Sequence, residues 1–228
     1  MAFLKIKTDR LESTVYTSTA LFVAATLLYF LPMNIPHELA FPLIILTVSS
    51  MWLCPWQITL ALVFSATGDW LGTEGLFIGQ MASFAVAHAC FILFFVKRYR
   101  TKVEPDRKLT GKAMGYTFMF LFMGAVLIIW SCISIAPKAP EGIVRTGVII
   151  YTFIICAMLV MALLQRSSLF AIGAVLFVFS DLILAWNMFV EPVEGADYLI
   201  MIPYYIGQWM LFVRSTPYRV PGLRRHRM

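Results

Sequence analysis

The chain has 228 residues, of which 61% are hydrophobic and only 13% are charged, and its mean hydropathy is +0.83. An ordinary soluble domain does not tolerate so apolar a surface, so the composition excludes that class and indicates a polytopic membrane protein. The net charge of +6 is explained by membrane topology and by contact with anionic lipids. We therefore expect the lipid bilayer as a partner and no nucleic acid.

A helix needs about 20 apolar residues to cross a bilayer, and the sequence supplies eight such stretches between charged residues, prolines and glycines. The predicted spans are residues 13–31, 38–53, 55–72, 75–96, 111–136, 143–164, 168–190 and 196–214. They predict an all-α fold, a polytopic membrane bundle of eight transmembrane helices that forms one domain over residues 1–228. Pro55 alone separates the second span from the third, so these two could also form one re-entrant hairpin.

Basic residues are distributed unevenly between the two sides of the predicted bundle. Both tails and the loops after the fourth and sixth spans lie on one side, and together they hold 16 of the 18 lysines and arginines. Only Lys138 and Arg145 lie on the opposite side. Because lysine and arginine gather in cytoplasmic segments, we expect both termini to be cytoplasmic, with a bacterial inner membrane as the expected location.

Two aspartates interrupt otherwise apolar spans: Asp69 near the end of the third span and Asp181 inside the seventh. A carboxyl group in the hydrocarbon region is costly, so intramembrane acids usually serve a site rather than the fold. Each aspartate follows a small residue, Gly68 or Ser180, and the two spans run in the same direction. This pattern predicts a parallel four-plus-four repeat in which the aspartates face each other. The competing interpretation gives Asp69 a loop or cap role near a helix end.

The other polar side chains of the spans belong to the fourth, seventh and eighth. They are Gln80, His88, Asn187, Tyr204, Tyr205 and Gln208. We predict one site built from the third, fourth, seventh and eighth spans, with the remaining four as scaffold. His88 either takes part in the chemistry or is a core histidine bonded to a carboxylate. The amides and tyrosines are predicted to support the site through hydrogen bonds.

Metal catalysis is disfavoured by the number of possible ligands. A zinc hydrolase ordinarily needs about three nitrogen, sulfur or oxygen ligands close together, and the chain has three histidines. His37 falls in the first outer loop and His226 in the C-terminal tail, which leaves His88 with the two aspartates. The sequence also contains no HExxH, GxSxG or phosphate-binding glycine motif. We therefore predict no metal and no cofactor.

Short motifs occur in a fixed order along the third, fourth, seventh and eighth spans. They are GDWL at 68–71, then Phe77, Gln80, Phe84 and His88, then SDLILAWNMF at 180–189 and PYYIGQ at 203–208. As an ordered set they resemble the YhhN family of eight-helix membrane proteins, whose characterised members are lysoplasmalogenases. The resemblance implies that Asp69 and Asp181 are the catalytic pair. The chain departs from the family pattern at Gln80, where glycine is usual, and at Phe91, where a tyrosine is frequent.

The resemblance also implies a substrate and a reaction. A lysoplasmalogen is a lysophospholipid with a vinyl ether, and acid hydrolysis protonates its alkene carbon to give an oxocarbenium ion, which water captures. The products are a fatty aldehyde and glycerophosphoethanolamine or glycerophosphocholine. As in glycoside hydrolysis, one protonated and one ionised carboxyl group suit this path. We assign Asp181 as the general acid and Asp69 as its partner, with the reverse assignment open.

Two other classes of function also use intramembrane acids. A proton-coupled transporter of a small molecule or lipid places paired acids in a helix bundle, and a structural or lipid-binding protein satisfies them with tyrosines and amides. Release of aldehyde by the purified protein in detergent separates the three classes, because a transporter needs a sealed membrane and a scaffold turns nothing over. The sequence leaves the head group, the chain length and the oligomeric state open.

Overall fold

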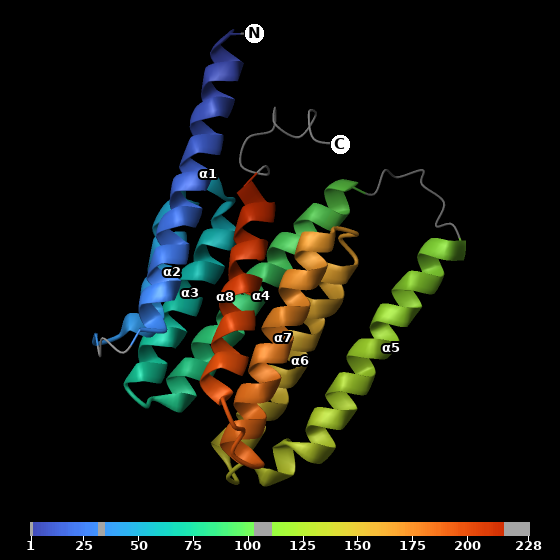
Figure 1. The fold of residues 1–228 in the computed structure, drawn as a ribbon. Helices are drawn as coiled ribbons and strands as arrows, with labels where there is room; N and C mark the ends of the chain where they lie inside the picture. The colour runs from blue at the N-terminus through green and yellow to red at the C-terminus, as the bar shows by residue number, and fades with distance from the viewer. Residues whose placement is uncertain (1, 32–34, 103–110, 217–228) are drawn as a thin grey trace. The chain divides into compact units, whose positions relative to one another are not determined.

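The computed structural model describes residues 2–31, 35–102 and 111–216, and every regular element within them is a helix (Figure 1). In chain order the elements are α1 (Ala2–Tyr29), η1 (Glu38–Ala40), α2 (Phe41–Leu53), α3 (Trp56–Thr73), α4 (Phe77–Lys102), α5 (Gly111–Ser134), η2 (Ala136–Lys138), α6 (Ile143–Leu163), α7 (Ser168–Phe189) and α8 (Ala196–Ser215). The predicted all-α class is confirmed. Each predicted span overlaps one α-helix, and most boundaries agree to within a few residues. The main exception is α1, which begins at Ala2, whereas the first predicted span begins at residue 13.

Five helices within the described residues are long and apolar enough to cross a membrane. The qualifying stretches are Leu11–Tyr29, Phe77–Thr101, Gly115–Lys138, Ile143–Leu163 and Ser168–Phe189. The chain is therefore an integral, multi-pass membrane protein. Of the other helices, α2 belongs to a shorter apolar helical stretch, Glu38–Leu53, and α3 and α8 are interrupted by polar residues such as Asp69 and Gln208. Eight crossings stay a prediction.

The predicted orientation depends on basic residues that lie partly outside the described residues. The basic residues outside the described part of the chain are Arg107 and Lys108 after α4, and Arg219, Arg224, Arg225 and Arg227 in the C-terminal tail. His226 also lies outside it. The cytoplasmic location of both termini and the four-plus-four repeat therefore stay predictions as well.

Pro55 separates α2 from α3, as its position in the sequence predicts. Cys54 has an extended backbone (φ −118°, ψ 159°), which is the conformation that a following proline favours. Pro55 then serves as the N-cap of α3, and α2 and α3 pack against each other as two distinct helices. At the other end of α3, Gly75 adopts φ 71° and the Leu76 amide donates to the Leu71 carbonyl oxygen at 2.9 Å. These are features of a Schellman motif, in which glycine supplies the left-handed residue.

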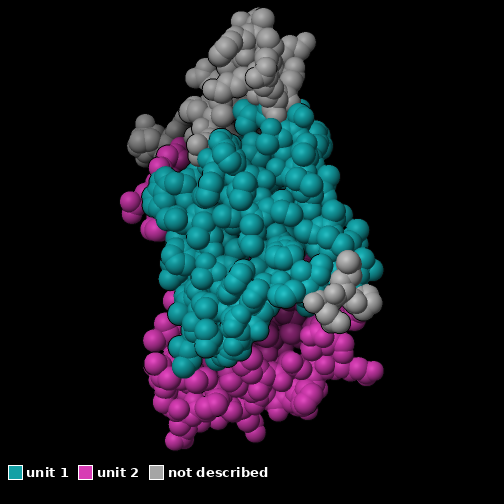
Figure 2. All heavy atoms as spheres, turned by 90° about the vertical axis from the view of Figure 1, so that its left-hand side faces the viewer, with its two compact units in different colours: residues 1–90, 209–228 teal, residues 91–208 magenta. Residues whose placement is uncertain are grey.

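The chain forms two compact units, coloured separately in Figure 2. Unit 1 comprises residues 1–90 and 209–228, and unit 2 comprises residues 91–208, so α4 and α8 contribute to both. In unit 1, α1 packs on α2 and α2 on α3. The end of α8 joins them, because the Trp209 indole N–H donates to Thr19 Oγ1 at 3.1 Å.

In unit 2, α6 packs against both α5 and α7. The C-terminal end of α4 is held to the short α6–α7 connection by Arg98, which is 3% exposed. Its guanidinium donates to Gln165 Oε1 at 2.5 Å and lies 5.2 Å from the centre of the Phe170 ring. The Gln165 amide in turn donates to the carbonyl oxygens of Phe95 and Met161 at 3.1 and 2.9 Å. Arg98, which the sequence assigns to a basic loop, is thus part of the packed end of unit 2.

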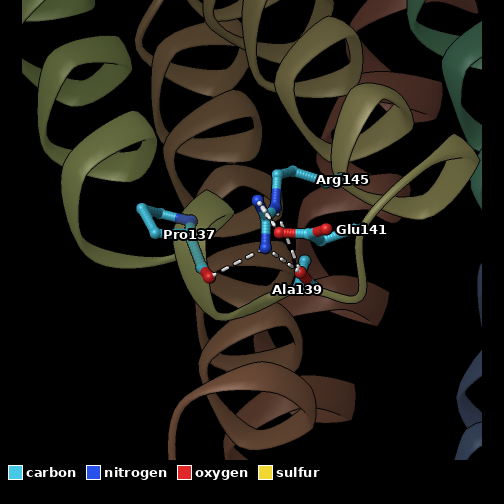
Figure 3. A network of polar contacts seen from close by, with 4 residues as sticks. All are labelled: Pro137, Ala139, Glu141 and Arg145. Carbon is cyan, nitrogen blue, oxygen red and sulfur yellow. Dashed lines mark hydrogen bonds and ion pairs between the residues drawn. The ribbon is translucent and has the colours of Figure 1, made fainter.

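A second arginine organises the connection between α5 and α6 (Figure 3). Arg145 donates from Nε and Nη2 to the Ala139 carbonyl oxygen at 3.2 and 3.1 Å, and from Nη2 to the Pro137 carbonyl oxygen at 3.2 Å. Its Nη1 also pairs with Glu141 at 3.2 Å. The connection is therefore folded around one side chain from the first turn of α6.

Candidate functional site

Asp69 lies on the buried face of α3 and is only 2% exposed. Glycines on either side of it bring α3 close to α4. A Cβ atom at Gly68 would come within 2.8 Å of the Phe84 ring, and one at Gly72 would come within 2.7 Å of the Gln80 amide nitrogen. A larger residue at either position would force the facing side chain of α4 to move, so α3 and α4 are in close contact on both sides of Asp69.

Gln80, Phe84 and His88 form one stripe of α4, because residues four apart lie on the same face of a helix. The contacts of Gln80 with Gly72 and of Phe84 with Gly68 show that this stripe faces α3 and that the two helices are antiparallel. The same register places His88 opposite the turn of α3 that precedes Gly68. By this register His88 lies further from the Gly72 end of α3 than Asp69 does, and it is fully buried.

Asp181 accepts a hydrogen bond that its sequence neighbours do not predict. The donor is the Tyr151 hydroxyl of α6, and the acceptor is Oδ2 of Asp181 on α7. Both side chains are half-buried. The sixth helix, predicted to be scaffold, therefore supplies a hydrogen-bond partner to a predicted site residue. The available signal was a tyrosine within an apolar helix, since a buried phenol usually finds a hydrogen-bond partner.

The next helix, α8, packs closely against α7, which carries Asp181. A Cβ atom at Gly207 would lie 2.8 Å from the Gly173 carbonyl oxygen, so the α7 and α8 backbones nearly touch there. One turn along from Gly173, Phe177 meets Tyr204 edge-on with ring centres 5.4 Å apart. Asp181 lies one further turn along α7 from Phe177.

The other predicted residues of α8 are also buried. Tyr205 and Gln208 are 1% and 0% exposed, and the rings of Tyr204 and Tyr205 are 5.4 Å apart. These buried side chains flank Gly207, where α8 comes close to the α7 backbone. The predicted tyrosines and the amide thus belong to the packed part of α8.

Asn187 fastens the connection between α7 and α8. Its side-chain oxygen accepts a hydrogen bond from the Val193 backbone amide at 2.8 Å. Beside it, the Trp186 indole N–H donates to Glu191 at 3.3 Å and its ring stacks on Trp130 of α5, with centres 5.6 Å apart. These contacts give Asn187 a defined structural role. Its part in the predicted site stays a prediction.

His37 lies in the connection before α2 and contacts the C-terminal end of α3, the end that carries Asp69. Its ring stacks on Trp70 with centres 3.9 Å apart, and its Nδ1 lies 2.7 Å from Thr73 Oγ1. The Thr73 hydroxyl donates to the Trp70 carbonyl oxygen at 2.7 Å, so it accepts from His37, which assigns a proton to Nδ1. The other ring nitrogen is 3.4 Å from Glu74.

The predicted site residues divide between the two units. Unit 1 holds Asp69, Gln80 and His88, and unit 2 holds Asp181, Asn187, Tyr204, Tyr205 and Gln208. The meeting of the two aspartates stays a prediction. Among the described side chains, no three histidines, cysteines, aspartates or glutamates are grouped so that they could hold a metal ion.

The sequence model of the YhhN family matches residues 39–216. The chain belongs to the YhhN family. The YhhN match begins in η1 and ends directly after α8, so it includes both aspartates, every other predicted site residue and Tyr151. All predicted site residues therefore lie within the part of the chain that matches the YhhN family.

Curated relatives of this YhhN chain include three mammalian proteins named lysoplasmalogenase TMEM86B. The mouse protein is 31% identical over 224 residues, which cover 90% of this chain and 88% of the relative. The rat protein is 30% identical over 173 residues, covering 75% and 65%, and the human protein is 30% identical over 162 residues, covering 71% and 64%. No solved structure matches the chain.

Proposed function

We propose that this protein is a membrane hydrolase of the lysoplasmalogenase type, which cleaves the vinyl ether bond of a lysophospholipid. Membership of the YhhN family and the names of the relatives support this class of reaction. The observation that carries the proposal is Asp181, an acid in the apolar helix α7 with one oxygen held by the Tyr151 hydroxyl. An intramembrane carboxyl group held by a specific partner is typical of a functional site.

In the proposed reaction, Asp181 and Asp69 act on one bound substrate. Asp181 donates its proton to the alkene carbon remote from the ether oxygen, and the electron pair of the double bond forms the new C–H bond. The positive charge is then shared by the other alkene carbon and the ether oxygen. The ionised carboxylate of Asp69 stabilises this oxocarbenium ion, as a carboxylate does in glycoside hydrolysis.

Water completes the reaction. Asp69 accepts a proton from a water molecule as the water oxygen bonds to the cationic carbon, which gives a hemiacetal. The hemiacetal then loses its hydroxyl proton, breaks its bond to the glycerol oxygen, and returns a proton to that oxygen. The products are a fatty aldehyde and glycerophosphoethanolamine or glycerophosphocholine, and transfer of one proton from Asp69 to Asp181 restores the starting state.

The remaining polar residues have supporting roles in this proposal. Gln80 and His88 share the face of α4 that meets α3, and we expect them to orient Asp69 or its water. Tyr204, Tyr205 and Gln208 are buried on α8 and are expected to line the substrate chamber. The chemistry requires a proton donor and no Lewis acid, because an alkene carbon offers a metal nothing to polarise.

We also propose eight membrane crossings with both termini cytoplasmic, in a bacterial inner membrane. The excess of lysine and arginine on the side of the two tails supports this orientation, because only Lys138 and Arg145 lie on the opposite side. Cysteines introduced as Lys5→Cys and Glu141→Cys test it in intact cells. A membrane-impermeant maleimide should label only the cysteine at position 141, and labelling at position 5 alone would reverse the topology.

The function is tested by incubating the purified protein in detergent with a lysoplasmalogen and measuring free aldehyde. The saturated alkyl ether of the same lipid is the matched control, because it has no alkene carbon to protonate. We expect aldehyde from the vinyl ether alone, and none with the Asp69→Asn or Asp181→Asn protein. Absence of aldehyde from folded wild-type protein, together with proton-coupled uptake in sealed vesicles, would favour the transporter.

A further inference from the structure

Tyr151 is a hydrogen-bond partner of Asp181, although it lies on a helix without any other candidate residue. Its hydroxyl donates to Oδ2 of Asp181. The two residues are brought together by α6 and α7, which are joined through the short connection at residues 164–167 and pack against each other. The contact is therefore built into one compact unit of the chain.

This hydrogen bond is compatible with both charge states of Asp181. A protonated carboxyl group has one O–H donor and keeps acceptor capacity, so it can still pair with the Tyr151 hydroxyl. After that proton has left, the same phenol donates to an ionised carboxylate, and hydrogen bonds with an ionised acceptor are the stronger ones.

The surroundings favour a fixed geometry for the pair. Tyr151 and Asp181 are each half-buried. The next residue of α6, Thr152, anchors the helix to α5, because its hydroxyl lies 3.1 Å from Ser131 Oγ. On α7, Ser180 is 1% exposed and Phe177 packs on Tyr204. Both partners thus sit on helix segments whose rotation is restricted by packing.

We propose that Tyr151 is a positioning residue for Asp181: it holds Oδ2 through this hydrogen bond and stabilises the carboxylate that remains after proton transfer. This inference rests on the proposed hydrolysis and adds a residue to it. The Tyr151 hydroxyl acts through Asp181 and has no contact of its own with the reacting carbon.

Tyr151→Phe tests the inference, because it removes one oxygen atom and keeps the ring. Loss of a hydrogen bond to a charged group should lower kcat roughly tenfold to hundredfold. KM should stay unchanged, since the hydroxyl does not contact substrate. Thr146→Val is the matched control: it removes a hydroxyl from an exposed position of the same helix, and it should leave kcat at the wild-type value.

A second readout does not depend on activity. The carboxyl stretching band of Asp181 can be identified by infrared difference spectroscopy as the band that disappears in Asp181→Asn. In Tyr151→Phe this band should move, because Oδ2 has lost its donor. If Tyr151→Phe folds poorly, a fluorinated tyrosine at position 151 keeps ring and hydroxyl and changes donor strength, so both the band and kcat should change.

The outcomes separate the two proposals. A wild-type protein that releases no aldehyde, but whose Asp181 band responds to Tyr151→Phe, contradicts the proposed function and leaves the hydrogen bond intact. A wild-type protein that hydrolyses the vinyl ether, with a Tyr151→Phe variant of equal kcat and an unmoved Asp181 band, overturns the positioning role.

Discussion

Gly207 of α8 lies so close to Gly173 of α7 that a Cβ atom on Gly207 would be 2.8 Å from the Gly173 carbonyl oxygen. The obstructing atom belongs to the backbone, so it cannot move aside as a side chain can. Membrane helices use small residues in this way to bring their backbones together. This contact positions α8 on the helix that carries Asp181.

We expect Gly207→Ala to destabilise the protein by about 1–3 kcal/mol, because the added methyl group forces α7 and α8 apart. The measurement is the midpoint of thermal unfolding in detergent, together with kcat. Gly115→Ala is the control, since nothing lies within 4 Å of the Cβ position of Gly115 on α5. Equal midpoints for the two variants would contradict the close packing of α7 and α8.

Asp181→Asn should abolish turnover and leave folding intact. Asparagine keeps the shape of the side chain and an oxygen that can accept from Tyr151, but it has no proton to transfer to carbon. Loss of general acid catalysis is expected to reduce kcat by at least ~10²-fold. Replacing a carboxyl group with an amide does not add a charge to the apolar helix, so the unfolding midpoint should not fall. Near-normal aldehyde release by this variant would remove Asp181 from the mechanism.

His88→Gln is expected to lower kcat only partially, by roughly tenfold, since His88 is predicted to orient an aspartate rather than to transfer the proton to carbon. Activity should also survive exhaustive chelation, because the proposed chemistry uses no Lewis acid. Aldehyde release is measured before chelation, after it, and after addition of zinc. Activity that disappears on chelation and returns with zinc would make His88 a metal ligand.

Arg98→Lys should lower the free energy of unfolding by about 1–3 kcal/mol. Lysine cannot reproduce the planar guanidinium that lies over Phe170 while it donates to Gln165. Arg100→Lys on the same helix is the control, because Arg100 is exposed. Both variants keep the charge, so a difference in unfolding midpoint reports on geometry alone. Identical midpoints would show that the buried contact contributes nothing.

The sequence by itself determined the helices and the two acids. The apolar stretches are long, and prolines and glycines such as Pro55 and Gly75 end helices through local backbone geometry. Asp69 and Asp181 stand out for a similar reason: an acid in an apolar span is unusual wherever its neighbours lie in space. Order along the chain also carried the motifs that place the protein in its family.

Only the tertiary structure shows which side chains contact one another. In a membrane helix nearly every position is apolar, so hydrophobic periodicity does not show which face meets a neighbour. The hydrogen bond from Tyr151 to Asp181, and the burial of Arg98 against Gln165, depend on the rotation and register of packed helices. Those are set by close contacts such as Gly207 on Gly173 and Gly68 on Phe84, where the glycine leaves room for a neighbouring helix to approach.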